Sequence, residues 1–88
     1  MTKSVFTARY ARFRQLLVEA RVAAALSQGE LASRLERPQS YVSKYERGER
    51  RLDVVELLEI TRVLGIDSAK LLAQLEATPA GDEPADAH

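Results

Sequence analysis

The sequence predicts an all-α fold of five short helices, with no β-strand. Apolar residues recur every three or four positions along most of the chain, as they do in amphipathic helices, and no segment alternates with a period of two. Residues that typically begin or end helices separate these stretches: Ser27, Pro38, Gly48, Asp53, Gly65 and Asp67. With 88 residues, the chain is expected to form one domain near the lower size limit for independent folding.

The first helix is expected over about residues 7–24, after a flexible arm at residues 1–5. Its apolar positions follow one another at alternating spacings of four and three: Phe6, Tyr10, Phe13, Leu17, Ala20 and Ala24. This stripe is typical of a helix that packs against a core. Three arginines lie off the stripe and are expected on the solvated outer face: Arg9, Arg12 and Arg14.

A capping box is expected to begin the second helix. The Ser27 side chain can accept a hydrogen bond from the amide of Glu30, while the Glu30 carboxylate can accept one from the amide of Ser27. The helix continues through a short apolar stripe that consists of Leu31, Ala32 and Leu35. It ends before Pro38, because proline lacks an amide hydrogen and disfavours helical geometry in the residue that precedes it.

The third helix is expected over residues 39–47, with Gly48 as its left-handed C-terminal residue. Val42 and Tyr45 lie three residues apart and are expected to face the core. The opposite face carries amide, hydroxyl and ammonium groups and no carboxylate, from Gln39, Ser40, Ser43 and Lys44. Such groups can bond to base edges and phosphates in a major groove, so this face is the candidate binding surface.

The fourth helix is expected over residues 54–64, with Asp53 as its N-cap and Gly65 as its end. Its apolar positions are Val54, Leu57, Leu58, Thr61 and Leu64. A basic loop, Glu49-Arg50-Arg51, precedes it.

Asp67 is expected to cap the last helix, which runs from residue 68 to about residue 75 and carries Leu71, Leu72 and Leu75. The folded domain is therefore expected to span residues 6–76. Residues 77–88 are rich in Pro, Gly, Ala and acids and have no periodicity, so they are expected to form a disordered acidic tail.

The composition argues against several classes of protein. There is no cysteine, hence no disulfide framework and no thiolate metal site. No apolar run approaches the ~20 residues that span a bilayer, and the basic N-terminus lacks the apolar core of a signal peptide, so we expect a cytoplasmic location and no membrane partner. The one histidine, His88, ends the acidic tail, and no glycine-rich phosphate loop is present. We therefore expect no enzyme, no cofactor and no metal.

The net charge of zero conceals a strong asymmetry. Residues 1–51 hold 11 Lys and Arg against 5 Asp and Glu, whereas residues 52–88 hold 2 against 8. The candidate binding face lies in the positive part. Because the local field attracts a polyanion more directly than the whole-chain charge does, the asymmetry favours nucleic-acid binding.

The stretch from about Phe13 to Leu75 resembles the helix-turn-helix family of phage repressors, Cro proteins and their bacterial (XRE-type) regulator relatives. The resemblance depends on these residues at this spacing: Leu26-Ser27-Gln28, Glu30-Leu31-Ala32, Gln39-Ser40, Val42-Ser43 and Glu46-Arg47-Gly48. The chain departs from the family pattern at Glu36, where a turn glycine is usual, and at Pro38, where Ser or Thr usually caps the recognition helix. Gly29 also weakens the first turn of its helix.

The resemblance implies a bacterial or phage-derived transcriptional regulator, most simply a repressor, that binds double-stranded DNA through the third helix. Base-reading roles fall to Gln39, Ser40, Ser43 and Lys44. Phosphate-binding roles fall to Gln28, Arg47, Arg50 and Arg51. The resemblance also implies an ion pair between Arg21 and Glu46, and no small-molecule ligand.

Two aspects of the assembly stay open at this point. A homodimer on a palindromic operator is expected, with an interface formed by Leu71, Leu72 and Leu75; alternatively, Leu71 and Leu72 close the core and Leu75 alone is exposed. The protein could also be an antitoxin or a protein-interaction adaptor that uses the same fold.

Overall fold

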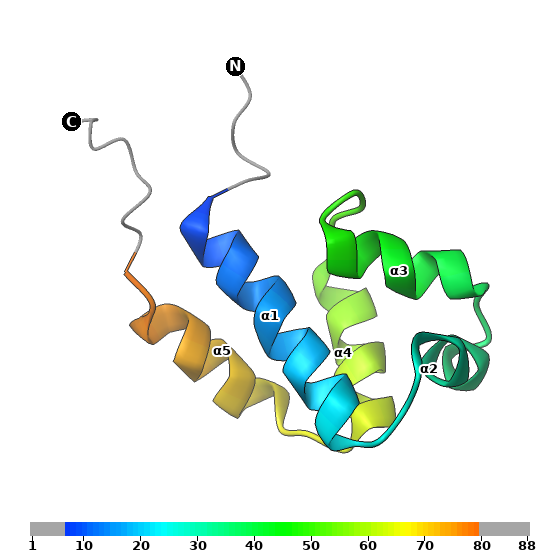
Figure 1. Cartoon of the computed structure of the whole chain (residues 1–88). Coiled ribbons are helices and arrows are strands. Elements are labelled where there is room, and N and C mark those ends of the chain that lie inside the picture. Colours follow the sequence, from blue (N-terminus) through cyan, green and yellow to red (C-terminus); the bar gives the residue numbers. More distant parts are fainter. Residues whose placement is uncertain (1–6, 80–88) are drawn as a thin grey trace.

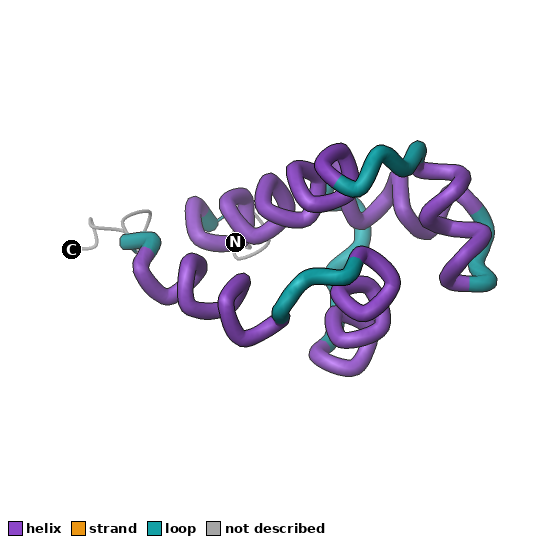
Figure 2. The backbone as a smooth tube through the Cα atoms, turned by 90° about the horizontal axis from the view of Figure 1, so that it is seen from below, coloured by secondary structure: helices purple, strands orange, loops and turns teal. Residues whose placement is uncertain are grey.

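The computed structural model describes residues 7–79, and within them it contains five helices and no strand (Figure 2). The helices are α1 (Ala8–Ala23), α2 (Gln28–Leu35), α3 (Gln39–Arg47), α4 (Val54–Leu64) and α5 (Ser68–Ala77). The predicted all-α fold is thereby confirmed. Because α5 continues to Ala77, the first residue of the predicted tail is helical. The predicted arm (1–5) and residues 80–88 of the predicted tail lie outside the described residues.

Local side-chain chemistry sets the helix ends. Ser27 Oγ accepts from the amide of Glu30 at 3.0 Å, and the Glu30 carboxylate accepts from the amide of Ser27 at 2.8 Å, so α2 begins with a complete capping box. Asp53 and Glu56 form the same arrangement at the start of α4. Gly48 ends α3 with φ +82° in the left-handed region, where a side chain is disfavoured.

The turn between α2 and α3 adopts the tight geometry of a helix-turn-helix despite the two departures from the family pattern. Glu36 ends α2 with φ +59°, the left-handed conformation that glycine adopts without strain. Pro38 occupies the N-cap of α3 in extended geometry and makes no side-chain capping bond. The turn thus carries a local cost in stability and still places α3 across α2 (Figure 1).

The core lies where α1, α2, α3 and α4 meet. Its most deeply buried large side chains come from all four helices: Leu17, Leu31, Val42, Tyr45 and Ile60. Tyr41 is also buried, although the sequence assigned only Val42 and Tyr45 to the inward face of α3. On α4 the apolar residues Val54 and Leu58 are exposed, because the buried face is centred on Ile60.

Helix α5 lies beside α1, on the side of α1 that faces away from α2 and α3 (Figure 1). The two helices are also joined where α1 begins, since Arg9 Nη2 donates to the carbonyl of Thr78 at 2.9 Å. Arg9 is therefore not simply a solvated side chain. Helices α2 and α3 therefore lie on the other side of α1 from α5 (Figure 1).

The three leucines of α5 have different surroundings, which corrects the predicted dimer patch. Leu71 is 5% exposed and belongs to the core, so it is not available to a second chain. The alternative was right that Leu71 closes the core, but wrong for the other two leucines, because Leu72 is 45% exposed and Leu75 is half-buried. The reason is rotation about α5, because Leu71 faces the other helices and Leu72 points about 100° away from it.

Candidate nucleic-acid interface

The predicted base-reading residues share one face of α3. Gln39, Ser40 and Lys44 are exposed and Ser43 is partly exposed, whereas Tyr41, Val42 and Tyr45 on the other face are buried. The Ser43 hydroxyl donates to the carbonyl of Ser40 at 3.3 Å, so it already has a local partner. The amide, hydroxyl and ammonium groups of this face are able to donate to bases, and those of Gln39 and the serines can also accept.

Glu46, the carboxylate nearest this face along α3, points inward. Its Oε2 accepts from Arg21 Nε at 2.7 Å, and its Oε1 accepts from Arg21 Nη2 at 3.2 Å, which makes the pair bidentate. The two side chains are only 14% and 6% exposed, respectively. The hydrogen bond to Glu46 raises the pKa of Arg21 further. The pair removes a negative charge from the exposed face and bridges α1 and α3.

Gln28 belongs to the same cluster. Its Nε2 donates to Glu46 Oε1 at 2.8 Å, so the side chain predicted to hold a phosphate connects α2 to α3 in the free protein. Arg21 Nη1 also donates to the carbonyl of Leu26 at 2.9 Å. We name Arg21, Gln28 and Glu46 the Glu46 cluster. It fixes α1, α2 and α3 relative to one another.

Arg14 joins this region, and the expectation that it is a solvated side chain was wrong. Arg14 Nη1 donates to the carbonyl of Glu46 at 2.9 Å, close to the C-terminal end of α3, where a cation is electrostatically favoured. A Cβ on Gly48 would lie 3.0 Å from Arg14 Cζ. The sequence carries no local signal for this contact, because 32 residues separate the two groups.

The predicted phosphate-binding arginines have different partners. Arg47 forms an exposed bidentate pair with Glu49, at 2.9 and 3.1 Å, which lowers the pKa of Glu49. Arg50 binds the carboxylate of Glu56, at 2.7 and 3.0 Å. The guanidinium of Arg51 lies over the Tyr10 ring, 4.2 Å from its centroid, and the residue itself is exposed. Arg47 and Arg51 therefore lie at the surface, whereas Arg50 pairs with Glu56, a carboxylate that is largely buried.

Among residues 7–79 no group of His, Cys, Asp and Glu could hold a metal ion. Within the same range, no helix is long and apolar enough to cross a membrane.

Comparisons with known proteins agree with this geometry. Residues 17–71, well over half of the chain, match the Helix-turn-helix family model (HTH_3). A solved structure, described as an XRE-family like protein from Pseudomonas syringae pv. tomato, is 56% identical, with a TM-score of 0.77 over 82% of this chain and 89% of that one. The uncharacterized HTH-type transcriptional regulator y4dJ of Sinorhizobium fredii is 36% identical over 56 residues, which are 64% of this chain and 73% of that protein. The chain therefore belongs to the helix-turn-helix (XRE-type) family of DNA-binding transcriptional regulators.

Proposed function

We propose that this regulator is a repressor that binds a palindromic operator, with α3 in the major groove of each half-site. The observation that carries the proposal is the exposed polar face of α3, from which Glu46 is turned away. Gln39 can bond to adenine in a bidentate manner, and Lys44 can reach O6 and N7 of guanine, while Ser40 and Ser43 add shorter contacts. Repression follows if the operator overlaps a promoter.

Phosphate contacts on either side of α3 would fix its register in the groove. Arg47, the last residue of α3, and Arg51, in the loop after it, are exposed cations, and Gln28 stands at the N-terminus of α2, where backbone amides favour an anion. Binding would require Arg47 to exchange Glu49 for a phosphate. Gln28 could contribute through its backbone amide while its side chain remains on Glu46.

A homodimer is part of the proposal, because one recognition helix reads only a few base pairs and a two-fold pair reads two half-sites about one helical turn apart. The support is a set of exposed aliphatic side chains on α4 and α5: Val54, Val55, Leu58 and Leu72. We name these residues the aliphatic face. Val54 and Leu72 line one hollow together with Leu57 and Leu75, and an exposed apolar patch is typical of a protein–protein interface.

Leu72→Glu tests the dimer, since a charge buried in the proposed interface would oppose association. Sedimentation at micromolar concentration should give a dimer for the wild type and a monomer for the variant. Val22→Glu, which places the same charge on an exposed aliphatic position of α1, should leave the dimer intact. A wild-type monomer, both free and on its operator, would contradict the dimer. A dimer that survives Leu72→Glu would place the interface elsewhere.

The operator itself can be found by selection from random DNA duplexes with the full chain. We expect enrichment of one sequence that contains two inverted half-sites with centres about one helical turn apart. Enrichment of a single half-site would argue against the palindrome, and no enrichment would argue against sequence-specific binding.

The aliphatic face also favours a second candidate function, in which the domain is an adaptor or an antitoxin that binds another protein. A gel-shift assay with genomic fragments, run beside a pull-down, separates the two functions. An adaptor would retain a partner protein and shift no DNA, whereas an antitoxin could do both.

A further inference from the structure

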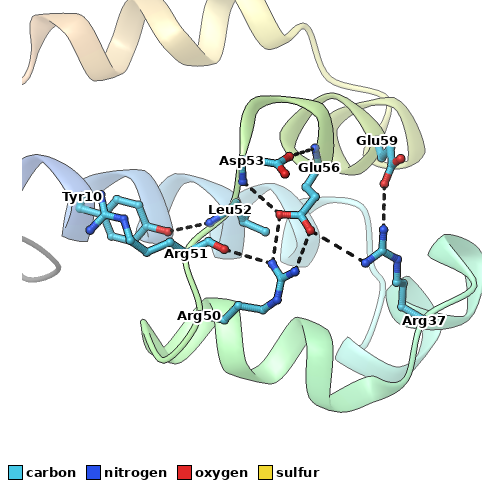
Figure 3. Close-up of polar contacts among 8 residues, drawn as sticks. All are labelled: Tyr10, Arg37, Arg50, Arg51, Leu52, Asp53, Glu56 and Glu59. Atoms are coloured by element: carbon cyan, nitrogen blue, oxygen red, sulfur yellow. Dashed lines mark hydrogen bonds and ion pairs between the residues drawn. The ribbon is translucent and has the colours of Figure 1, made fainter.

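A second cluster of charged side chains gathers around Glu56, in the first turn of α4 (Figure 3). The Glu56 carboxylate accepts from Arg50 Nη2 at 2.7 Å, from Arg50 Nη1 at 3.0 Å and from the amide of Asp53 at 3.0 Å. Arg37, in the turn between α2 and α3, lies 3.9 Å from Glu56 and 3.4 Å from Glu59. One carboxylate thus connects the helix-turn-helix turn, the loop after α3 and the start of α4.

The two arginines of this cluster enclose an aromatic ring of α3. The guanidinium carbons of Arg37 and Arg50 lie 4.6 and 4.8 Å from the centroid of the Tyr41 ring. Such distances are typical of cation–π contacts. Arg50 therefore has a carboxylate at its edge and a ring at its face, and moving it to a phosphate would break both interactions.

The loop at residues 50–53 is held at each of its residues. Besides its bonds to Glu56, Arg50 Nη1 donates to the carbonyl of Arg51 at 3.0 Å. The amide of Leu52 donates to the Tyr10 hydroxyl at 3.3 Å, and the Arg51 guanidinium lies over the Tyr10 ring (Figure 3). The loop is consequently ordered before any DNA arrives, which avoids an ordering cost on binding.

We infer that Glu56 is a positioning residue for DNA binding: it holds Arg50 and the backbone of residues 50–53 so that Arg51 meets a phosphate. Arg50 belongs to this frame, in place of the phosphate-binding role that the family resemblance implied for it. The inference rests on the proposed DNA-binding function. It gives Glu56 a role that its charge alone would not, since a carboxylate beside a phosphate-binding loop repels DNA.

The sign of the effect on affinity distinguishes positioning from simple repulsion. Glu56→Gln removes the charge and keeps a capping-box residue at the third position of α4. Glu59→Gln is the matched control, because it removes the same charge one turn further along α4, from an exposed side chain that pairs with Arg37 and makes no contact with the loop at residues 50–53 among the bonds of the described residues. On the selected duplex we expect Glu56→Gln to bind about fivefold to tenfold more weakly and Glu59→Gln to bind equally well or slightly better.

A double-mutant cycle then tests whether Glu56 acts through the loop. The loss of affinity caused by Arg51→Ala should be smaller in the Glu56→Gln background than in the wild type, because a displaced loop no longer presents Arg51. The loss caused by Lys44→Ala should be the same in both backgrounds. Thermal unfolding of each variant establishes that it is folded at the assay temperature.

If Glu56→Gln proves unfolded, Glu56→Asp replaces it, because aspartate keeps the charge and shortens the reach to Arg50. Positioning then predicts weaker binding at unchanged net charge. Given that the wild type binds the duplex, either of two results overturns the inference. The first is a folded Glu56→Gln that binds at least as tightly as Glu59→Gln, or a folded Glu56→Asp that binds at least as tightly as the wild type. The second is an additive double-mutant cycle with Arg51→Ala. If the wild type binds no duplex, the proposed function fails and the inference falls with it.

Discussion

Two carboxylates, Glu46 and Glu56, each bind one arginine with both oxygens, yet they hold together different parts of the molecule. The bonds of Glu46 reach Arg21 on α1 and Gln28 on α2, which lie 25 and 18 residues away along the chain. The bonds of Glu56 reach Arg50 and Asp53, six and three residues away, and Arg37 completes its surroundings. The first cluster is internal to the helix frame, and the second stands beside a surface loop.

The difference shows how one type of interaction can serve stability in one place and binding in another. Glu46 closes long loops between helices, so its partners stay together only when the whole domain is folded. Glu56 fixes a short loop and a helix start whose geometry concerns the ligand more than the fold. Loss of Glu46 should therefore appear mainly in the free energy of unfolding, whereas loss of Glu56 should appear in DNA affinity as well as in stability.

The largest expected effect is that of Glu46→Ala, which leaves Arg21 partly buried without its partner. We expect a loss of ~3 kcal/mol in the free energy of unfolding, measured by urea denaturation. Glu49→Ala breaks the exposed pair with Arg47 and should cost far less, because solvent screens an exposed pair. Equal losses for the two variants would show that the Glu46 pair is no stronger than a surface pair.

Acid should weaken the Glu56 cluster over a defined range of pH. The bonds from Arg50 and from the amide of Asp53 lower the pKa of Glu56 from 4.5 to about 2. The unfolded chain therefore binds a proton at Glu56 before the folded protein does, and stability from this group falls as the pH decreases from about 4.5 towards 2. Glu56→Gln should flatten the acid limb of the stability curve by about 1–2 kcal/mol, measured by urea denaturation between pH 5 and pH 2. The same acid limb in Glu56→Gln and in the wild type would contradict the lowered pKa of Glu56.

A smaller effect separates two glycines that both end helices with positive φ. Gly48→Ala and Gly65→Ala each introduce a Cβ into the left-handed region, at a cost of about 1 kcal/mol. Only at Gly48 does the Cβ approach Arg14, whose guanidinium binds the carbonyl of Glu46; nothing lies within 4 Å at Gly65. Gly48→Ala should cost roughly 0.5–1 kcal/mol more than Gly65→Ala. Equal melting temperatures would mean that the Arg14 side chain moves away from the new Cβ without a cost in stability.

The sequence was informative where structure is local. The capping box at Ser27, the N-cap at Asp53 and the left-handed ends at Gly48 and Gly65 predicted helix boundaries to within one or two residues, because each signal acts within a turn of helix. The pairing of Arg21 with Glu46 came from family resemblance and could not have come from spacing.

Tertiary contacts were not readable in this way. Arg14 looked like a surface residue because its partner, the carbonyl of Glu46, is a backbone group 32 residues away. Arg50 looked like a phosphate ligand because loop composition does not reveal that Glu56 turns back towards it. The apolar pattern of α4 did not distinguish the buried Ile60 from the exposed Val54 and Leu58, because periodicity marks apolar faces without saying which one is covered.

Binding of the selected duplex by Lys44→Ala and Arg51→Ala, titrated at several salt concentrations, tests the central claim that α3 reads bases while the loop after it holds phosphates. Lys44→Ala should lower affinity for the selected sequence by ~1–3 kcal/mol and relax the preference at one base position. Arg51→Ala should weaken binding to all sequences alike and reduce the slope of log affinity against log salt concentration by about one. Lys70→Ala on α5 should change neither the affinity nor this slope. If Lys44→Ala and Arg51→Ala reduce affinity without any change in sequence preference, α3 does not read bases and the account is wrong.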